Sequence, residues 1–237
     1  MFIKFPMNKN KNHIRKMFDS ISDEYDFLNN VITAGQHLKW KSEIVEIAKS
    51  VNPKLILDLA TGTSDIAINL SQIKNCKIIG VDISSDMLSK AQKKIDKKDL
   101  SEIISLETGD AQNLKFNDNK FDIVTIGYGI RNFEQLEAGL KESHRVLKDD
   151  GLLIILETSV PSNKFLKFLY NIYTLTFIPL ITTLFSNNPA AYNYLEKSAK
   201  EFPYGKNLKN ILLKVGFSEV EFKPKMLGAS TIYTSKK

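Results

Sequence analysis

The sequence predicts an α/β fold built on a seven-stranded, mostly parallel sheet, and two patterns along the chain support this class. After Asn52-Pro53, short apolar runs alternate with amphipathic stretches of helical length, and strands separated by such helices pair in parallel through βαβ crossovers. Near the C-terminus two short strands follow each other closely, which predicts an antiparallel pair at one edge of the sheet. We therefore expect a Rossmann-like sheet with an antiparallel edge strand, N-terminal helices and a helical insertion.

The individual elements follow from the local pattern. Residues up to about 50 predict helices, because HLKWKSEIVEIAKSV has apolar residues at helical spacing and DSISDEYDFLNNVI begins with candidate caps at Asp19 or Ser20. Helices are also expected at SDIAINLSQI, at SSDMLSKAQKKI, and at EQLEAGLKESHRVLK, which Asp149-Asp150-Gly151 is expected to end. The strands are expected at KLILDLA, KIIGVDI, EIISLE, FDIVTIGYG, LLIILE, FSEVEFKP and ASTIYTSKK.

Residues 161 to about 205 do not fit this alternation. Residues 163–185, NKFLKFLYNIYTLTFIPLITTLF, are apolar enough for a membrane span, but two lysines, Asn171, four threonines and Pro179 argue against one. Two interpretations stay open: buried core helices, or a lid that lines an apolar pocket or touches lipid. We expect one domain over residues 1–237, with an N-terminal helical cap at 1–50 and a helical insertion or lid at 161–205.

Composition and charge exclude several classes of protein. The chain has 237 residues, 43% of them hydrophobic, which suits one sizeable core. The lone Cys76 cannot form an internal disulfide and three scattered histidines offer no metal site, so a reducing cytosol and no metal are expected. The N-terminus has no apolar segment followed by a small-residue cleavage site, so no secretory signal is expected. The net charge of +6 comes from scattered lysines, which predicts no nucleic-acid partner.

The loop DLATGTSDIA follows the first predicted strand, and its charges indicate the ligand it holds. A dinucleotide loop needs the pattern G-x-G-x-x-G, whereas here the three positions are Ala60, Gly62 and Asp65. Asp58 adds a second carboxylate at the end of the strand. Negative charge on both sides is unsuited to two phosphates but suits a cationic nucleoside without phosphate, and S-adenosylmethionine has a sulfonium, an ammonium and a ribose.

The next two strands end in carboxylates as well. Asp82 lies 20 residues beyond Gly62, the spacing at which an acidic residue accepts hydrogen bonds from ribose hydroxyls. The third strand is followed by GDAQNL, which places Asp110 and Ala111 at the same edge, where a carboxylate can hold an adenine amino group. Although each Asp alone is more often a helix cap or turn residue, together they predict nucleoside binding.

Motifs along almost the whole chain resemble the demethylmenaquinone/ubiquinone C-methyltransferase family. The resemblance covers about residues 17–237 and rests most firmly on FDSIS-x3-YD-x-LN and the IRNF run, since many class I S-adenosylmethionine-dependent methyltransferases share the cofactor loop. It is carried further by GQHLKWK, GVDIS, HRVLKDDGLLIILE, AAYNYLEKSAKEFPYG and KVGFSEV. LETSVP and STIYTSK resemble the menaquinone branch more than the ubiquinone branch.

The resemblance implies both a cofactor and residues that bind it. The Thr63 region, Asp82, Asp110-Ala111 and the strand end at Gly127 are expected to contact S-adenosylmethionine. Two positions depart from the family pattern. At the first, Ser64 stands where the family usually has Gly, so either the backbone there is unstrained or the chain carries strain of about 1–3 kcal/mol. Gly127 replaces a Ser found in some members, which removes one side-chain hydrogen bond to the cofactor.

The resemblance also implies the reaction: methyl transfer to a ring carbon of a reduced quinone that carries an isoprenoid tail, the last step of menaquinone biosynthesis. Arg131 is expected to donate to the phenolate oxygen, because its pKa above about 12 makes it a poor base, and Asn132 is expected to face the ring beside it. Tyr25 is expected either to donate to the substrate or shuttle its proton, or to pack the N-terminal helices over the sheet. His144 and His37 are interpreted as structural.

A polyprenyl quinol partitions into lipid, so a cytoplasmic enzyme with a transient, peripheral contact to the inner face of the cytoplasmic membrane is implied. The candidates for the tail channel and membrane-facing surface are Phe165, Phe168, Tyr170 and Tyr173, with Lys164 and Lys167 near anionic headgroups. The alternatives are the ubiquinone-pathway benzoquinol, another small apolar substrate, a non-enzymatic nucleoside-binding module or a nicotinamide dehydrogenase. The sequence leaves a monomer and a homodimer open.

Overall fold

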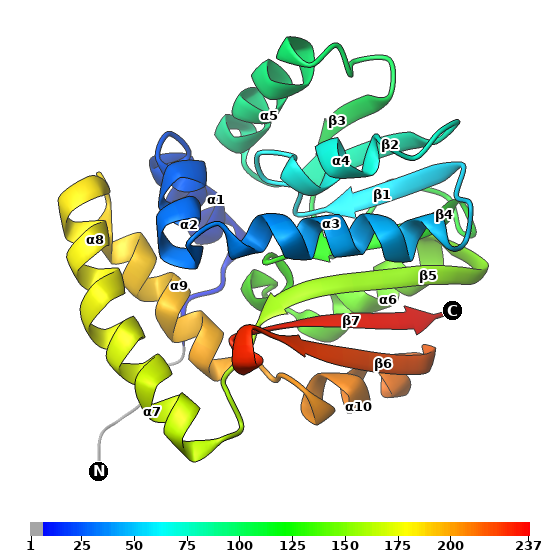
Figure 1. The fold of residues 1–237 in the computed structure, drawn as a ribbon. Coiled ribbons are helices and arrows are strands. Elements are labelled where there is room, and N and C mark those ends of the chain that lie inside the picture. The colour runs from blue at the N-terminus through cyan, green and yellow to red at the C-terminus, as the bar shows by residue number, and fades with distance from the viewer. Residues whose placement is uncertain (1–6) are drawn as a thin grey trace.

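The computed structural model describes residues 7–237, and within this range seven strands form one sheet (Figure 1). Their order is β3-β2-β1-β4-β5-β7-β6. Strands β1 to β5 pair in parallel, and β7 runs antiparallel to both neighbours, with β6 outermost, as the two closely spaced final strands predicted. The bounds are Leu55–Leu59 (β1), Lys77–Asp82 (β2), Ile104–Thr108 (β3), Phe121–Gly127 (β4), Leu147–Thr158 (β5), Ser218–Lys225 (β6) and Ser230–Lys236 (β7).

Helices cover both faces of the sheet, and each layer has its own apolar core. On one face lie α3 (Gln36–Lys49), α4 (Asp65–Leu70) and α5 (Ser85–Lys97), whose buried residues meet Ile56, Ile78 and Ile154 of the sheet. On the other face lie α6 (Leu136–Val146) and α10 (Lys206–Val215), packed on residues such as Phe121 and Tyr233. These two layers hold the strands so that the carboxyl ends of β1, β2 and β4 meet at one edge.

Two expected boundaries are wrong, each for a physical reason. Asp149-Asp150-Gly151 does not end α6, because Leu147 is already extended, fully buried and paired with Phe121, so the three residues form an irregularity inside β5. Asp19 and Ser20 do not cap a helix but lie within α1 (Lys11–Ile21), which Asn10 caps through its side chain. A second helix, α2 (Tyr25–Thr33), follows. Residues 1–6 of the expected N-terminal cap lie outside the described residues.

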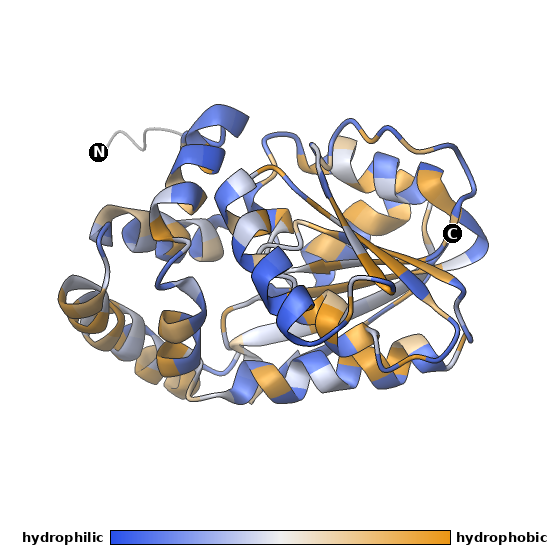
Figure 2. Cartoon of the chain, turned by 90° about the horizontal axis from the view of Figure 1, so that it is seen from above, coloured by the Kyte–Doolittle hydropathy of each residue, from blue (hydrophilic) through white to orange (hydrophobic). Residues whose placement is uncertain are grey.

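The insertion forms the end of the molecule away from the sheet (Figures 1 and 2). Helices α7 (Lys164–Ile172) and α8 (Ile178–Phe185) join through a π-helical turn at Tyr173–Phe177, and α9 (Pro189–Glu201) packs back against α8 and α1. The widened turn precedes Pro179, which lacks the N–H that a regular helix needs. Only 11% of the most apolar window in Lys164–Phe185 is buried, so the interpretation as buried core helices is wrong. By length and composition alone, this helix could cross a membrane.

Candidate active site

The loop after β1 takes an unusual backbone path at the edge of the sheet. Ala60, Gly62 and Ser64 all have positive φ, at 52°, 56° and 62°. Ser64 thus adopts a left-handed conformation that glycine would adopt freely, at a cost of about 1–3 kcal/mol. Its buried hydroxyl lies 3.2 Å from the hydroxyl of Thr61. The path turns the Gly62 N–H toward β2, where it donates to Asp82 Oδ2 over 2.8 Å.

A first cavity lies over these strand ends and gathers five of the residues that the sequence predicted for the cofactor: Gly62, Asp82, Asp110, Ala111 and Gly127. Besides the Gly62 contact, Asp82 accepts from the Ser84 N–H at 2.9 Å, which leaves further lone pairs on its carboxylate for a ligand. Burial raises the pKa of Asp82, and the backbone N–H groups oppose that rise. The arrangement suits a ligand that offers neutral hydroxyl donors, such as a ribose.

The N-terminal helices cover this cavity. Ile14 and Phe18 of α1 and Tyr25 of α2 contribute to its lining. Asp19 accepts a hydrogen bond from Ser84 at the start of α5, and Asp23 pairs with Lys90 one turn further along. Asp19 and Asp23 of the FDSISDEYD motif therefore attach the cap to α5, whereas Glu24 accepts hydrogen bonds from Ser186 and Asn187 after α8.

Asp58 and Thr63 line a second cavity and not the first. The Asp58 carboxylate is fully buried and accepts hydrogen bonds from the hydroxyls of Thr61 at 2.6 Å and Thr125 at 2.5 Å. Burial raises the pKa of Asp58 to about 6, and these hydroxyls limit the rise. Asp58 thus fixes the loop by holding Thr61.

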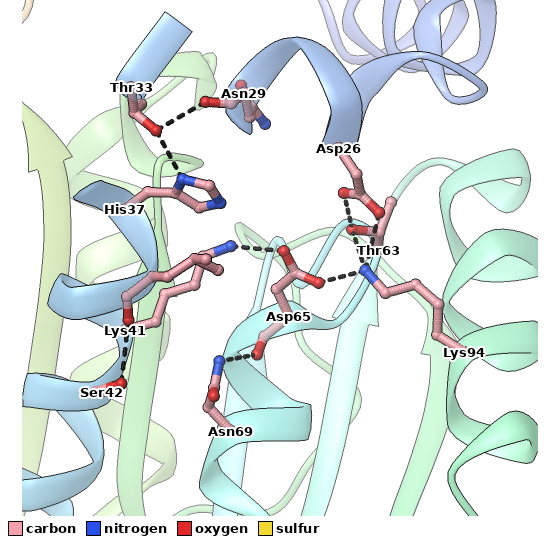
Figure 3. A network of polar contacts seen from close by, with 11 residues as sticks. Asp26, Asn29, Thr33, His37, Lys41, Ser42, Thr63, Asp65, Asn69 and Lys94 are labelled. Atoms are coloured by element: carbon pink, nitrogen blue, oxygen red, sulfur yellow. Dashed lines mark hydrogen bonds and ion pairs between the residues drawn. The ribbon is translucent and has the colours of Figure 1, made fainter. Parts of the chain in front are cut away.

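Thr63 belongs to a network of charges between α2, α3, α4 and α5 (Figure 3). Its hydroxyl donates to Asp26 over 2.6 Å and lies 3.1 Å from the Lys94 ammonium, which also contacts Asp26 and Asp65. Lys41 pairs with Asp65 at 2.6 Å. The sequence argument treated Asp65 as a negative charge facing the loop; two lysines compensate it, so that part of the argument is wrong.

The second cavity opens to solvent, is larger than the first and is lined mainly by helical segments. It shares five lining residues with the first cavity: Tyr25, Ala60, Gly62, Gly127 and Tyr128. The two cavities therefore adjoin at these five residues. Its remaining wall includes the aromatic side chains of Trp40, Tyr170, Tyr173 and Tyr192.

The predicted catalytic residues are distributed over both cavities. Arg131, in a 3-10 turn at Ile130–Asn132, lines the second cavity, Asn132 lines the first, and Tyr25 lines both. Both side-chain polar atoms of Asn132 are buried without a hydrogen-bond partner among residues 7–237. Since buried amides are normally satisfied, a ligand or water is expected to bind there. Burial raises the pKa of Tyr25 although the Arg131 charge opposes the rise, so its hydroxyl stays protonated at neutral pH.

Arg131 is held by an ion pair and by hydrogen bonds within the protein. Its Nη1 donates to Glu157 Oε1 at 2.7 Å and to the Tyr128 carbonyl at 2.6 Å, and its Nε lies 3.3 Å from the Ser198 hydroxyl. Glu157 is fully buried at the end of β5. Sequence reasoning missed Glu157, although a carboxylate at the end of an otherwise apolar strand is a detectable signal, because buried charges are normally paired.

Neighbouring side chains leave no space for a Cβ at Gly127 or Gly129. A Cβ on Gly127 would lie 2.1 Å from Ile66 Cδ1. The Ile66 side chain on α4 therefore fills the space that a side chain at position 127 would need. A Cβ on Gly129 would lie 2.4 Å from Ala60 Cβ, which cannot rotate away. The end of β4 thus packs closely on α4, and the segment after β4 packs closely on the loop after β1.

The aromatic residues predicted for the tail channel separate into two groups. Tyr170 and Tyr173 line the second cavity, and the Tyr173 hydroxyl donates to the Ile32 carbonyl of α2. Phe165 and Phe168 are exposed on the outer side, with Leu175, Leu180 and Leu184 at helical spacing along the same segment. His144 lies outside both cavities, against Phe217 at a ring-centroid distance of 5.0 Å.

Comparisons with known proteins agree with this geometry. The model of the ubiE/COQ5 methyltransferase family matches residues 6–237. The chain is 40% identical to a demethylmenaquinone methyltransferase of Bacteroides fragilis, over 97% of this chain and 94% of that protein. It is 37% identical to a ubiquinone/menaquinone biosynthesis C-methyltransferase of Geotalea uraniireducens, over 98% of this chain and 100% of that protein.

Solved structures support the fold at lower identity. An S-adenosylmethionine-dependent methyltransferase from Thermotoga maritima has a TM-score of 0.64 at 21% identity, over 95% of this chain and all of that one. A phosphoethanolamine N-methyltransferase of Haemonchus contortus, solved with S-adenosylmethionine, has a TM-score of 0.58 at 15% identity, over 78% of this chain and 48% of that one. Both share the class I methyltransferase architecture of strands and flanking helices.

Proposed function

The chain belongs to the ubiE/COQ5 methyltransferase family and is an S-adenosylmethionine-dependent C-methyltransferase of quinone biosynthesis, and we propose that its substrate is reduced demethylmenaquinone. The product would be menaquinol, at the last step of menaquinone biosynthesis. The name of the Bacteroides fragilis relative supports this choice of substrate. The Geotalea uraniireducens name, which covers both pathways, keeps the ubiquinone-pathway benzoquinol as the second candidate.

The observation that carries the proposal is the pair of cavities joined at Tyr25, Ala60, Gly62, Gly127 and Tyr128. The first cavity is the smaller one and carries carboxylates suited to a nucleoside, whereas the second is larger and has several aromatic side chains in its wall. Methyl transfer needs the donor and the acceptor carbon in line and in contact, and a junction between two cavities provides that arrangement.

The residues of the first cavity fit S-adenosylmethionine. Asp82 would accept from the ribose hydroxyls, Asp110 from the adenine amino group, and Ala111 and Gly127 would leave room for the ring and the methionine part. When bound, the cofactor supplies a methyl group on a positively charged sulfur. Asp58 and Thr63 would hold the loop in shape from the side of the second cavity.

In the second cavity, Arg131 would stabilise the phenolate that makes the neighbouring ring carbon nucleophilic. Glu157 fixes the guanidinium through Nη1, and Nη2 takes no part in the contacts to Glu157, Tyr128 and Ser198. The side-chain amide of Asn132 would form hydrogen bonds with a ligand at the edge of the first cavity. The Tyr25 hydroxyl would donate to a ring oxygen of the quinol near the junction.

The exposed apolar side of Lys164–Phe185 would rest on the cytoplasmic membrane surface, which is where a polyprenyl quinol is found. Tyr170 and Tyr173 on the inner side would then guide the tail into the second cavity. A helix with one face on a cavity and the other exposed suits a peripheral contact in the plane of the membrane.

A direct test compares methyl transfer from labelled S-adenosylmethionine to reduced demethylmenaquinone and to the ubiquinone-pathway benzoquinol, side by side in detergent and without oxygen. Product from the first substrate alone would support the menaquinone assignment. Product from both would make the enzyme dual-pathway. Tight cofactor binding without product from either would reject quinol methylation and favour another small apolar substrate.

A further inference from the structure

His37 is a buried histidine in the first turn of α3 that lines the second cavity, and neither the sequence argument nor the proposed function gives it a role. Its side chain is 5% exposed. In Figure 3 one ring nitrogen faces Thr33, and the other points away from Thr33 into the space between α2 and the loop after β1. Of the two ring nitrogens, Nδ1 therefore contacts Thr33, and Nε2 points away from that contact.

Hydrogen-bond accounting assigns the protons of this ring. The Thr33 hydroxyl donates its single proton to the Asn29 carbonyl over 2.8 Å, and a carbonyl can only accept. The same hydroxyl oxygen lies 2.6 Å from His37 Nδ1. Both contacts are hydrogen bonds only if Nδ1 carries a proton and donates it to Thr33. In the neutral ring, Nε2 is then the unprotonated nitrogen, with a lone pair that takes part in none of the hydrogen bonds found within residues 7–237.

The charged groups around His37 favour this neutral form. Burial and the Lys41 ammonium lower the pKa of His37 below its ordinary value, against the opposing charges of Asp65 and Asp26. Lys94 adds a second positive charge. These four groups form the network of Figure 3, so their charges largely cancel and the imidazole is uncharged at neutral pH.

The other titratable groups that line this cavity are unsuited to accept a proton. Arg131 stays protonated, and the tyrosine hydroxyls, with pKa values raised by burial, are acids rather than bases at neutral pH. Two lysines compensate Asp65, and Lys200 pairs with Glu196. Asp58 is only 1% exposed and has a hydroxyl bound to each carboxylate oxygen. Among the described residues that line this cavity, His37 best combines a neutral base with an unused lone pair.

We propose that His37 Nε2 is the general base that removes the hydroxyl proton of the quinol, directly or through one water molecule. This inference rests on the proposed function. The O–H bond breaks and its proton goes to Nε2; the ring carbon beside the resulting phenolate bonds the methyl group, and the S–C electron pair stays on sulfur. The methylated carbon then loses its hydrogen as a proton to water, and the imidazolium returns its proton to the oxygen, so that one proton is released overall.

The test compares His37→Gln with His144→Gln, a matched control whose histidine lies outside both cavities. His37→Gln is expected to lower kcat about 100-fold, as loss of a general base does, with the affinity for S-adenosylmethionine unchanged and KM for the quinol within about threefold. The wild type should lose activity on an acidic limb below pH 6.5, where His37 becomes protonated, and the variant should lack that limb. Added imidazole should restore part of the rate.

Thr33→Val provides a second, independent variant, because it removes the acceptor of Nδ1 while the imidazole remains. It should lower kcat about tenfold and shift the pH at which the acidic limb of the activity profile occurs. If His37→Gln and Thr33→Val keep the wild-type kcat and acidic limb, the role of His37 as base is overturned. If the wild type binds S-adenosylmethionine but methylates no quinol, the proposed function fails, and the assignment of His37 fails with it.

Discussion

The two cavities are built in opposite ways. The first lies on the ends of parallel strands, where Gly127 and Gly129 leave no space for a Cβ and Asp82 is held by two backbone N–H groups. The second lies among helices, where side chains form the walls and an apolar face of α7 and α8 is exposed. Backbone geometry therefore fixes the first cavity, the proposed cofactor half of the site, whereas the second cavity, the proposed substrate half, depends on helices joined to the first by a few polar contacts.

The helix α2 links these halves. Asp26 attaches it to Thr63 of the cofactor loop and to Lys94 of α5, while Tyr25, its neighbour in sequence, lines both cavities. A change in the first half should thus alter cofactor affinity and stability, and a change in the second should alter substrate handling.

The largest effect is expected from Arg131→Ala, which removes a cation that lines the second cavity and donates to the carbonyl of the junction residue Tyr128. Loss of a positioned donor to a developing oxyanion lowers kcat about 100- to 1000-fold. The variant also leaves Glu157 buried without its partner, which costs about 3–5 kcal/mol of stability. Methyl-transfer kinetics and thermal unfolding measure the two effects. The double variant Arg131→Met/Glu157→Gln is the control, because it should regain stability but not activity.

Asp58→Asn tests how the buried carboxyl group of Asp58 makes the stability of the fold depend on pH. Its pKa rises from 3.8 to about 6 in the folded chain, so between these values the folded state binds more protons than the unfolded state. Stability should therefore fall as pH rises through this window, by up to about 3 kcal/mol for a shift of about two units. Asp58→Asn should lack this component in urea unfolding between pH 4 and 7. An identical pH dependence in both proteins would show that Asp58 does not carry the shift.

Gly129→Ala tests whether backbone contact fixes the cofactor cavity. The new methyl group would meet Ala60 Cβ, and overpacking of this kind costs about 1–3 kcal/mol, so cofactor affinity should fall about tenfold. Isothermal titration with S-adenosylmethionine measures it. Ala60→Gly/Gly129→Ala should restore affinity, because it removes the opposing Cβ. Failure of this pair to recover would place the effect elsewhere than in the contact.

The exposed face of the insertion offers a test of the substrate half. Phe168 and Leu184 are 60% and 65% exposed, and changing both to Asp should weaken binding to anionic vesicles about tenfold per side chain. Turnover of a long-tailed quinol in vesicles should fall in parallel, with turnover of a short-tailed soluble analogue unchanged. Leu213→Asp on α10, where Leu213 is 46% exposed, is the matched control. An equal loss in that control would reject a specific membrane face.

The smallest effect is expected from Asp26→Asn, which weakens the link between the halves. Its ion pair with Lys94 is partly exposed, and such pairs contribute about 0.5–1 kcal/mol, or a decrease in Tm of about 1–4 °C. Cofactor affinity should fall about twofold, since Thr63 loses a charged partner. Asp23→Asn, which removes the more exposed pair with Lys90, should leave that affinity unchanged. The difference should shrink in high salt.

The sequence by itself determined the mostly parallel sheet and five residues that line the first cavity. Period and spacing are local properties, and the strand ends that carry Asp82, Asp110 and Gly127 meet because parallel strands align their carboxyl ends. The antiparallel pair at the C-terminus followed from the short connection between two strands. The local pattern at Asp149-Asp150-Gly151 predicted a helix end wrongly, because the chain is extended from Leu147 onward by its pairing with β4.

Only the tertiary structure decided which charges have partners and which side of each helix is covered. Asp65 meets Lys41 and Lys94, Arg131 meets Glu157, and His37 meets Thr33, and apart from the last pair these contacts join residues 24 to 29 positions apart along the chain. The exposure of Phe168 and the inward position of Tyr173 likewise depend on how α8 and the π-helical turn before it pack against α2. Ionisation and burial depend on distances through space, which the order of residues does not specify.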